Sequence, residues 1–161
     1  MIVYKFGGTS LANAARMKSV ADLITRDEVQ KVVVLSAASG TTDTLIRLSA
    51  ATPEEGEKII QGMEEQYQRY VSELLDDADC RQAAERFLEY TFASLREALG
   101  KPLPRDEKWF VAYGEIMSTS LFSLLMVERG ISSAYLAALD FMRIRDGEPD
   151  MDAIKKLVHE A

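Results

Sequence analysis

The sequence predicts an α/β fold built on a parallel sheet, and two observations support that prediction. Near the N-terminus, segments 2–6 (IVYKF) and 31–37 (KVVVLSA) each have the length and apolar composition of a short strand. A segment with apolar residues at helical spacing separates them, and another helix is predicted after the second segment. This strand–helix–strand–helix alternation is typical of α/β proteins whose strands run parallel.

The first predicted helix starts near Thr9 or Ser10, either of which is a suitable N-cap. Its apolar residues recur three or four positions apart, at Leu11, Ala14, Met17, Ala21 and Ile24. The strand at 31–37 is an unbroken run of apolar, mostly β-branched residues, which predicts burial on both faces of a parallel sheet.

The central part of the chain predicts two long amphipathic helices joined by a short acidic turn at 76–79 (DDAD). The first helix has an apolar stripe over 59–75, and the second has one over 84–99. Together they form a helical hairpin over about 55–100, which we interpret as an insertion that leaves the sheet and returns to it. We expect its aromatic residues to serve packing; they are Tyr67, Tyr70, Phe87, Tyr90 and Phe92.

The last third of the chain continues with mixed elements. A third long helix is predicted from about Asp106 to Arg129, ending before Gly130. Segment 131–141 predicts a strand with a turn, and 144–150 (IRDGEPD) predicts a turn-rich loop. Residues from 151 onward predict the start of another helix.

Composition and charge narrow the possible functions. The 161 residues are 47% apolar and 28% charged, as in ordinary soluble globular domains. No apolar run approaches the roughly 20 residues that span a membrane, and the first residues do not resemble a signal peptide. We therefore expect a cytoplasmic protein without a membrane partner. A net charge of −7 with no long basic cluster argues against nucleic-acid binding.

The single cysteine and the single histidine argue against several kinds of site. Cys80 cannot form an internal disulfide and lacks metal-site spacing. A Ser–His–Asp or Cys–His triad needs a histidine inside the fold, whereas His159 stands close to the end of the sequence. We therefore predict neither metal-binding residues nor a nucleophilic triad.

The first candidate site is the segment KFGGTS, from Lys5 to Ser10. Glycines after a strand allow a sharp turn and a close approach of the backbone to a ligand. The helix start that follows offers unpaired N–H groups, and the lysine adds a positive charge, so the segment suits a phosphate. The order of residues is not that of a Walker A loop or of Gly-x-Gly-x-x-Gly. A turn without a ligand needs glycine too, so the pattern alone leaves both interpretations open.

The second candidate is SAASGTTD, from Ser36 to Asp43. Its hydroxyl groups follow a strand and could bind a ligand, or Thr42 or Asp43 could cap the next helix. Because parallel strands end at the same edge of a sheet, segments 7–10 and 36–43 are expected to face one shared site.

The third candidate is GEIMST at 114–119, inside a predicted apolar helix. Glu115, Ser118 and Thr119 share one helix face at i, i+3 and i+4. Glu115 could hold the ammonium group of a ligand, or it could be an exposed or paired structural carboxylate.

In their order and approximate separations, the three motifs resemble those of the aspartate kinases, which belong to the amino acid kinase family. KFGGTS resembles the opening motif of that family, VVVLSAASGTTDTL its second motif and YGEIMSTSLF its third. The resemblance runs from residue 1 to about residue 150 and is weakest in the helical hairpin. It implies a three-layer α/β/α sandwich with a parallel sheet, incomplete here, in which residues 1–161 form the N-terminal part of a kinase domain.

The resemblance also implies an activity, the ATP-dependent phosphorylation of the β-carboxylate of L-aspartate to 4-phospho-L-aspartate. This reaction begins lysine, threonine and methionine biosynthesis. By position, Lys5 would be the catalytic residue that offsets charge on the transferring phosphoryl group. The phosphates of ATP would be bound by Lys5, Gly7, Gly8, Thr9, Ser10 and Ser36. Aspartate would be bound by Ser36, Thr42 and Glu115, with Glu115 holding the amino group. Mg²⁺ would be held mainly by the nucleotide.

The family's later Gly-rich segment, its nucleotide-binding half and its ACT regulatory domains have no counterpart in these residues. We therefore expect a fragment that is inactive alone, exposes apolar surface and self-associates. The complete enzyme is expected to be a homo-oligomer. Kinases of glutamate, uridylate or carbamate are an alternative that Gly-Glu-x-Met-Ser-Thr argues against. Two more alternatives are a non-catalytic binding or assembly module and the N-terminus of a bifunctional aspartokinase–homoserine dehydrogenase.

Overall fold

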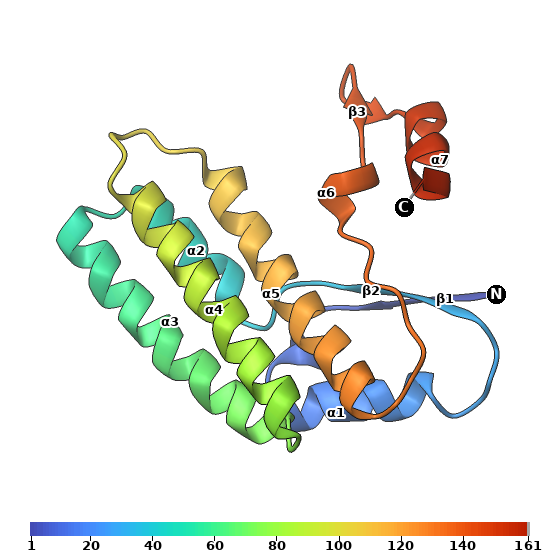
Figure 1. The fold of residues 1–161 in the computed structure, drawn as a ribbon. Coiled ribbons are helices and arrows are strands. Elements are labelled where there is room, and N and C mark those ends of the chain that lie inside the picture. The colour runs from blue at the N-terminus through green and yellow to red at the C-terminus, as the bar shows by residue number, and fades with distance from the viewer. Residues whose placement is uncertain (161) are drawn as a thin grey trace.

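The computed structural model describes residues 1–160 and consists mainly of helices beside one short parallel sheet (Figure 1). The side chain of His159 lies outside the described part. The elements in chain order are β1 (Ile2–Phe6), the 3₁₀ turn η1 (Gly8–Leu11), α1 (Ala14–Ile24), β2 (Lys31–Leu35), α2 (Thr41–Ala50), α3 (Pro53–Leu74), α4 (Ala78–Leu99), α5 (Glu107–Glu128), α6 (Ala138–Phe141), β3 (Ile144–Arg145), β4 (Glu148–Pro149) and α7 (Met151–Glu160).

The strands β1 and β2 pair in parallel, as the alternation of segments predicts, with Ile2 opposite Lys31 and Phe6 opposite Leu35. A parallel pair needs a crossover connection, which η1 and α1 supply. The Ser36 N–H donates to the Phe6 carbonyl at 3.1 Å and extends the pairing by one residue. Both strands therefore end at the same edge of the sheet.

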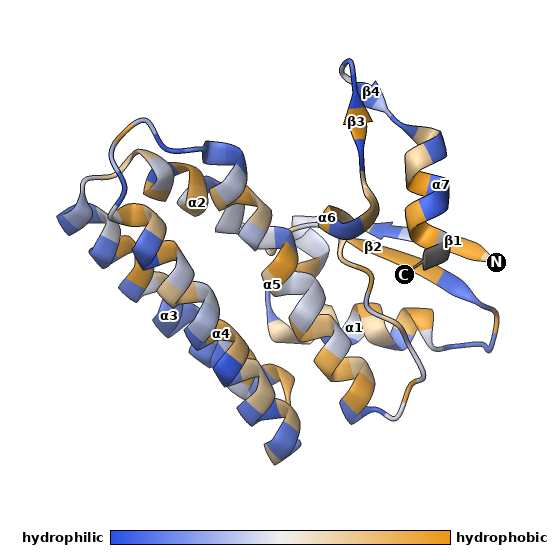
Figure 2. Cartoon of the chain, turned by 45° about the horizontal axis from the view of Figure 1, so that its top comes forward, coloured by the Kyte–Doolittle hydropathy of each residue, from blue (hydrophilic) through white to orange (hydrophobic). Residues whose placement is uncertain are grey.

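One face of this sheet packs on the core and the other is exposed. The core face carries Tyr4, Phe6, Val33 and Leu35, which belong to or pack against the hydrophobic core, and β2 contacts α5. Because side chains alternate along a strand, the opposite face carries Lys5 with three valines. Those valines are Val3, Val32 and Val34, which are 64%, 42% and 47% exposed. Figure 2 colours most of both strands as hydrophobic.

The prediction that the second strand is buried on both faces is therefore wrong for residues 1–160. Within that range, the helical core covers only the face with Val33 and Leu35. A continuous apolar run does not show whether other elements pack on both faces of the strand or on only one, because the run carries no information about which elements lie next to it. A parallel sheet with one face packed on the helical core agrees with the incomplete sandwich that the motifs predict. The expected self-association stays a prediction.

The predicted helical hairpin is confirmed as α3 and α4, which lie side by side in Figure 1. Thr52 and Glu55 form a capping box at the start of α3, where Glu55 accepts from the Thr52 N–H. Arg96 of α4 joins the two helices through ion pairs to Glu57 at 2.9 Å and Glu64 at 2.6 Å. The hairpin packs through α3 on α1 and α2, and through α4 on α5.

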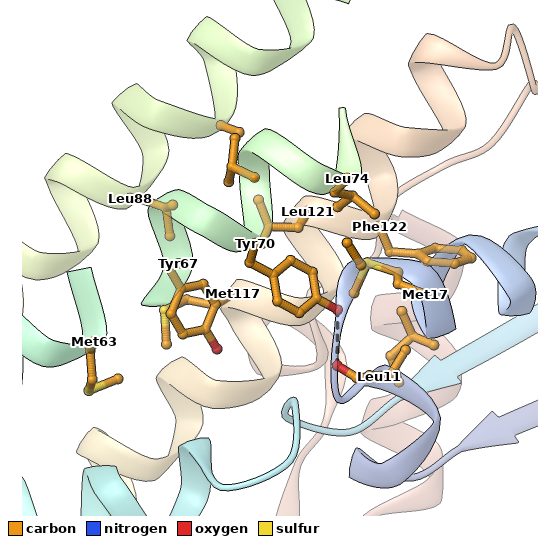
Figure 3. Packing of buried hydrophobic residues seen from close by; sticks show 14 of the residues in the cluster. Leu11, Met17, Met63, Tyr67, Tyr70, Leu74, Leu88, Met117, Leu121 and Phe122 are labelled. Carbon is orange, nitrogen blue, oxygen red and sulfur yellow. Dashed lines mark hydrogen bonds between the residues drawn. The ribbon is translucent and has the colours of Figure 1, made fainter. Parts of the chain in front are cut away.

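The third long helix is confirmed as α5, which forms the centre of the core. Its buried residues include Phe110, Met117, Leu121 and Phe122, the last three of which lie near α3 in Figure 3. By length and composition alone α5 is apolar enough to cross a membrane, so the expectation that no segment meets that test is wrong. Its packing against α1, α2, α4 and β2 accounts for the apolar composition.

The segment after α5 differs in part from the sequence prediction. The expected strand at 131–141 is wrong, since residues 131–137 have no regular structure and α6 follows. No strand of the described residues pairs with this segment, and extended backbone without a pairing partner is not a strand. The predicted turn at 144–150 forms the β3–β4 hairpin around Asp146 and Gly147, both with positive φ. The final predicted helix is confirmed as α7.

Candidate functional site

The segments after β1 and β2 come into direct backbone contact at the shared sheet edge. A Cβ added to Gly8 would lie 2.9 Å from the carbonyl oxygen of Ala37 and 3.5 Å from the backbone of Ser39. The first of these distances is too short for a real side chain, so only glycine permits the two segments to approach this closely. The predicted meeting of segments 7–10 and 36–43 is confirmed.

Lys5 reaches the glycine turn from the exposed face of the sheet. Its ammonium nitrogen would lie 3.8 Å from a Cβ built on Gly7, so the charge of Lys5 lies beside the start of the loop. The side chain of Lys5 is exposed, and Gly7 accepts a hydrogen bond from the Ser10 N–H at 3.0 Å. The Thr9 side chain is exposed, and its carbonyl accepts from the Arg16 guanidinium at 3.0 Å.

The caps of the two helices differ from the sequence predictions. Helix α1 is capped by Asn13, whose side chain accepts from the Arg16 N–H at 3.0 Å, and not by Thr9 or Ser10. The residues after Gly8 form the turn η1 first, which moves the helix start to Ala14. Thr9 and Ser10 thus belong to the loop rather than to the helix cap.

Helix α2 starts after Gly40, whose φ of 81° lies in the left-handed region that favours glycine. The alternative that Thr42 or Asp43 caps α2 is wrong, because both residues lie inside its first turn. Among the described residues, the Thr42 hydroxyl has no hydrogen-bonding partner, and neither has that of Ser36. These two hydroxyl groups remain available to a ligand at the sheet edge.

Helix α5 brings the third motif to the same place. A Cβ on Gly114 would lie 2.7 Å from the Cβ of Ala37, so α5 and the second loop touch at a position that only glycine allows. The Ala37 N–H donates to a carboxylate oxygen of Glu115 at 3.4 Å. The Ser118 hydroxyl donates to the Ser36 carbonyl at 2.8 Å, and Thr119 donates to the Glu115 carbonyl.

All three motifs therefore meet at Ala37, which is buried. Its carbonyl oxygen faces Gly8 of the first motif, its N–H bonds to Glu115, and its methyl group faces Gly114 of the third motif. A side chain at Gly8 or at Gly114 would collide with Ala37. The sequence brings the motifs to one site, but it did not identify Ala37 as their point of contact.

Two tyrosines of the hairpin also reach this region, although the sequence analysis assigned them to packing alone. The Tyr67 hydroxyl lies 3.0 Å from the Thr41 hydroxyl, and the Tyr70 hydroxyl donates to the Leu11 carbonyl at 2.9 Å. Burial raises the pKa of Tyr67 to about 12, and the negative charge of Glu115 contributes to that rise. Burial also raises the pKa of Tyr70 above its ordinary value. The sequence could have indicated this role, because these two positions of an apolar stripe hold tyrosine rather than phenylalanine, and a buried tyrosine hydroxyl needs a hydrogen-bonding partner.

The chain is similar to known proteins along its whole length. Residues 1–161 match the family described as the amino acid kinase family. The chain belongs to this family. The match covers the sheet, both loops, the helical hairpin and α5 together.

Named relatives are aspartokinases. The chain is 32% identical over 166 residues to lysine-sensitive aspartokinase 3 of Escherichia coli (strain K12), with 98% of the chain and 36% of that protein covered. It is 31% identical to the aspartokinase of Chlamydia pneumoniae, with 99% and 36% covered. The crystal structure of E. coli aspartokinase III in complex with aspartate and ADP matches at a TM-score of 0.82 and 29% identity, covering 99% of this chain and 37% of that one. This member of the amino acid kinase family thus spans little more than a third of these relatives' length.

The contact at Gly114 predicts opposite effects of the same substitution at two helical glycines. Gly114→Ala should lower the free energy of unfolding by about 1–3 kcal/mol, because the new methyl group collides with Ala37. Gly62→Ala in α3 is the matched control, since its Cβ would meet no atom within 4 Å. That change should raise stability by up to about 1 kcal/mol through helix propensity. Urea unfolding measures both; equal stabilisation by the two substitutions would disprove the contact.

The raised tyrosine pKa values predict a loss of stability in alkali. Above about pH 10 an unfolded tyrosine releases its proton, whereas folded Tyr67 keeps its proton to about pH 12. The contribution is fully present below pH 10, and the free energy of unfolding should fall as pH rises from 10 to 12. Absorbance of phenolate at 295 nm would follow the six tyrosines. A common midpoint near pH 10 for all six in the folded chain would contradict the prediction.

Proposed function

We propose that this chain forms the aspartate-binding part and one wall of the phosphate site of an aspartate kinase. That enzyme transfers the γ-phosphoryl group of ATP to the β-carboxylate of L-aspartate and releases ADP and 4-phospho-L-aspartate. The observation that carries the proposal is the meeting of three motifs around Ala37. This arrangement places the ammonium group of Lys5, the hydroxyl groups of Ser36 and Thr42 and the carboxylate of Glu115 at one edge of the sheet.

The phosphate side is formed by the first motif. Lys5 is proposed as the catalytic residue, because its ammonium group lies beside Gly7 and can offset negative charge on the transferring phosphoryl group. Gly7, Gly8, Thr9 and Ser10 offer backbone and hydroxyl groups in the same loop. The absence of a side chain at Gly8 lets the loop run directly against the second segment.

The aspartate side is formed by the second and third motifs. Glu115 supplies the negative charge that the α-ammonium group of aspartate needs, and its long 3.4 Å bond to the Ala37 N–H is easily exchanged for a bond to a substrate. Ser36 and Thr42 supply hydroxyl groups for a carboxylate or phosphate oxygen. Ser118 and Thr119 bond to backbone carbonyls and hold the segment rather than the substrate.

The chemistry suits such a site because phosphoryl transfer depends mainly on positioning and electrostatic stabilisation. The attacking group is the carboxylate of the substrate, so no nucleophilic side chain is required. ATP with Mg²⁺ is the proposed phosphoryl donor. Mg²⁺ is proposed to be held mainly by the nucleotide. The metal would neutralise charge on the ATP phosphates.

We further propose that residues 1–161 are the N-terminal part of the kinase domain, with the hairpin of α3 and α4 as an insertion. The nucleotide-base pocket and the regulatory domains are assigned to chain outside these residues. On its own this chain is expected to have no aspartate-dependent ATP turnover. The complete enzyme is proposed to be a cytoplasmic homo-oligomer in the pathway to lysine. The alternative is that the chain is the N-terminal part of a bifunctional aspartokinase–homoserine dehydrogenase.

Lys5→Ala should lower kcat of the complete kinase that contains this chain by about 100-fold or more, with a smaller change in KM. The reason is the loss of a positive charge that acts on the transition state. Lys58→Ala is the matched control, because Lys58 is an exposed lysine of α3. Steady-state kinetics with ATP and L-aspartate measure both variants. Turnover near that of the wild type would remove Lys5 from the mechanism.

Glu115→Gln should raise the KM for L-aspartate by about 10- to 100-fold and leave the KM for ATP almost unchanged, because a charged hydrogen bond to the ammonium group is lost. Glu107→Gln at the exposed start of α5 is the control. Equal increases in both KM values would assign Glu115 a structural role. A wild-type protein that binds aspartate but never phosphorylates it would favour a non-catalytic binding module.

A further inference from the structure

We propose that Tyr67 and Tyr70 are positioning residues whose hydroxyl groups hold the two loops of the site in place. They lie one helical turn apart on α3, in the segment where the resemblance of the sequence to the family is weakest. Tyr70 fixes the first loop and Tyr67 the second. The consequences for catalysis rest on the proposed function, but the structural part does not.

Tyr70 fixes the end of the glycine loop. Its hydroxyl donates to the carbonyl of Leu11, the last residue of η1, at 2.9 Å (Figure 3). Leu11 is fully buried, and 59 residues separate it from Tyr70. The hydrogen bond therefore ties the loop that carries Gly7 and Gly8 to a helix outside the sheet.

Tyr67 fixes the start of α2. Its hydroxyl lies 3.0 Å from that of Thr41, the first residue of α2, and both groups are buried. The Thr41 methyl group would lie 3.6 Å from a Cβ on Gly114, so the same threonine also lies against α5. Tyr67 thus acts on the part of the site that contains Thr42 and Glu115.

The hydroxyl groups, rather than the rings, carry this inference. A buried hydroxyl costs free energy unless it forms a hydrogen bond, and phenylalanine would fill nearly the same space without that cost. The two tyrosine rings stack at 6.1 Å, and Phe92 of α4 meets Tyr67 edge-on at 6.2 Å. The rings are therefore held by packing, and each hydroxyl is aimed at one loop.

One turn of α3 reaches the segments that follow both strands, since Tyr67 bonds to Thr41 after β2 and Tyr70 bonds to Leu11 after β1. The sequence distance from Thr41 to Tyr67 is 26 residues, so α3 links parts of the chain that local structure cannot hold together.

The first test needs no substrate. Tyr67→Phe and Tyr70→Phe are compared in the full chain by amide hydrogen exchange, with Tyr90→Phe as the control, because Tyr90 is 74% exposed. Tyr70→Phe should speed exchange at 8–13, and Tyr67→Phe at 37–44, by about tenfold or more, with little change in α4. A uniform increase across α3 and α4, or no change in either loop, would overturn the proposal.

The second test uses kinetics of the complete kinase. Tyr67→Phe should raise the KM for L-aspartate by about tenfold with little change for ATP, since small displacements of a binding group weaken a site strongly. Tyr70→Phe should instead lower kcat or raise the KM for ATP. Thr41→Val removes the partner hydroxyl and should reproduce the effect of Tyr67→Phe without adding to it.

The outcomes separate this inference from the proposed function. A wild-type enzyme that does not phosphorylate aspartate disproves the proposed function, while the exchange pattern still decides whether the tyrosines hold the loops. An active wild-type enzyme whose two tyrosine variants change both substrates equally disproves the positioning roles and leaves the proposed function intact.

Discussion

The architecture of the site depends on the close packing around Ala37. The carbonyl of this residue faces Gly8, its N–H bonds to Glu115, and its methyl group faces Gly114. Parallel pairing of β1 and β2 brings the first two segments together, but the missing side chains at two glycines let three backbones share the space. A larger residue at either glycine would separate a loop or a helix from the others. The positions of the charged groups result from that junction.

The charges have complementary places around the junction. Lys5 approaches from the exposed face of the sheet, while Glu115 approaches from α5, so a ligand with both an ammonium group and an acidic group meets both signs of charge. The helical hairpin supports this arrangement through α3, where the hydroxyl of Tyr70 bonds to Leu11 and that of Tyr67 bonds to Thr41. A site that works by positioning needs such support, because phosphoryl transfer relies on placed charges more than on reactive side chains. The exposed valines of the sheet lie on the face that Lys5 shares.

Much of the fold could be predicted because periodicity reports local structure directly. The parallel strand pair, the hairpin and α5 were predicted from the spacing of apolar residues, and the resemblance of three motifs identified the family. The prediction of a strand at 131–141 was wrong because a strand needs a pairing partner, and the sequence pattern does not show whether one is present. The cap residues of α1 and α2 were predicted wrongly because several polar residues near each helix start are suitable caps. The turns that precede the helices place Asn13 and Gly40 at the cap positions. The partners of Ala37, Tyr67 and Tyr70 could not be predicted, since local periodicity does not report contacts between distant segments, although tyrosine on an apolar stripe indicates a buried hydroxyl that needs a partner. The roles of Lys5, Ser36, Thr42 and Glu115 remain predictions.

The central claim is that the three motifs form one aspartate site around Ala37. The most direct measurement is an NMR titration of the ¹⁵N-labelled chain with L-aspartate, using succinate, which lacks the ammonium group, as the control. The Ala37 amide signal should move saturably with L-aspartate as Glu115 turns from this N–H to the substrate, and signals of 36–42 should move with it. Succinate should move the Ala37 signal much less. Saturating L-aspartate that leaves the signals of Ala37 and Glu115 unmoved would contradict the account.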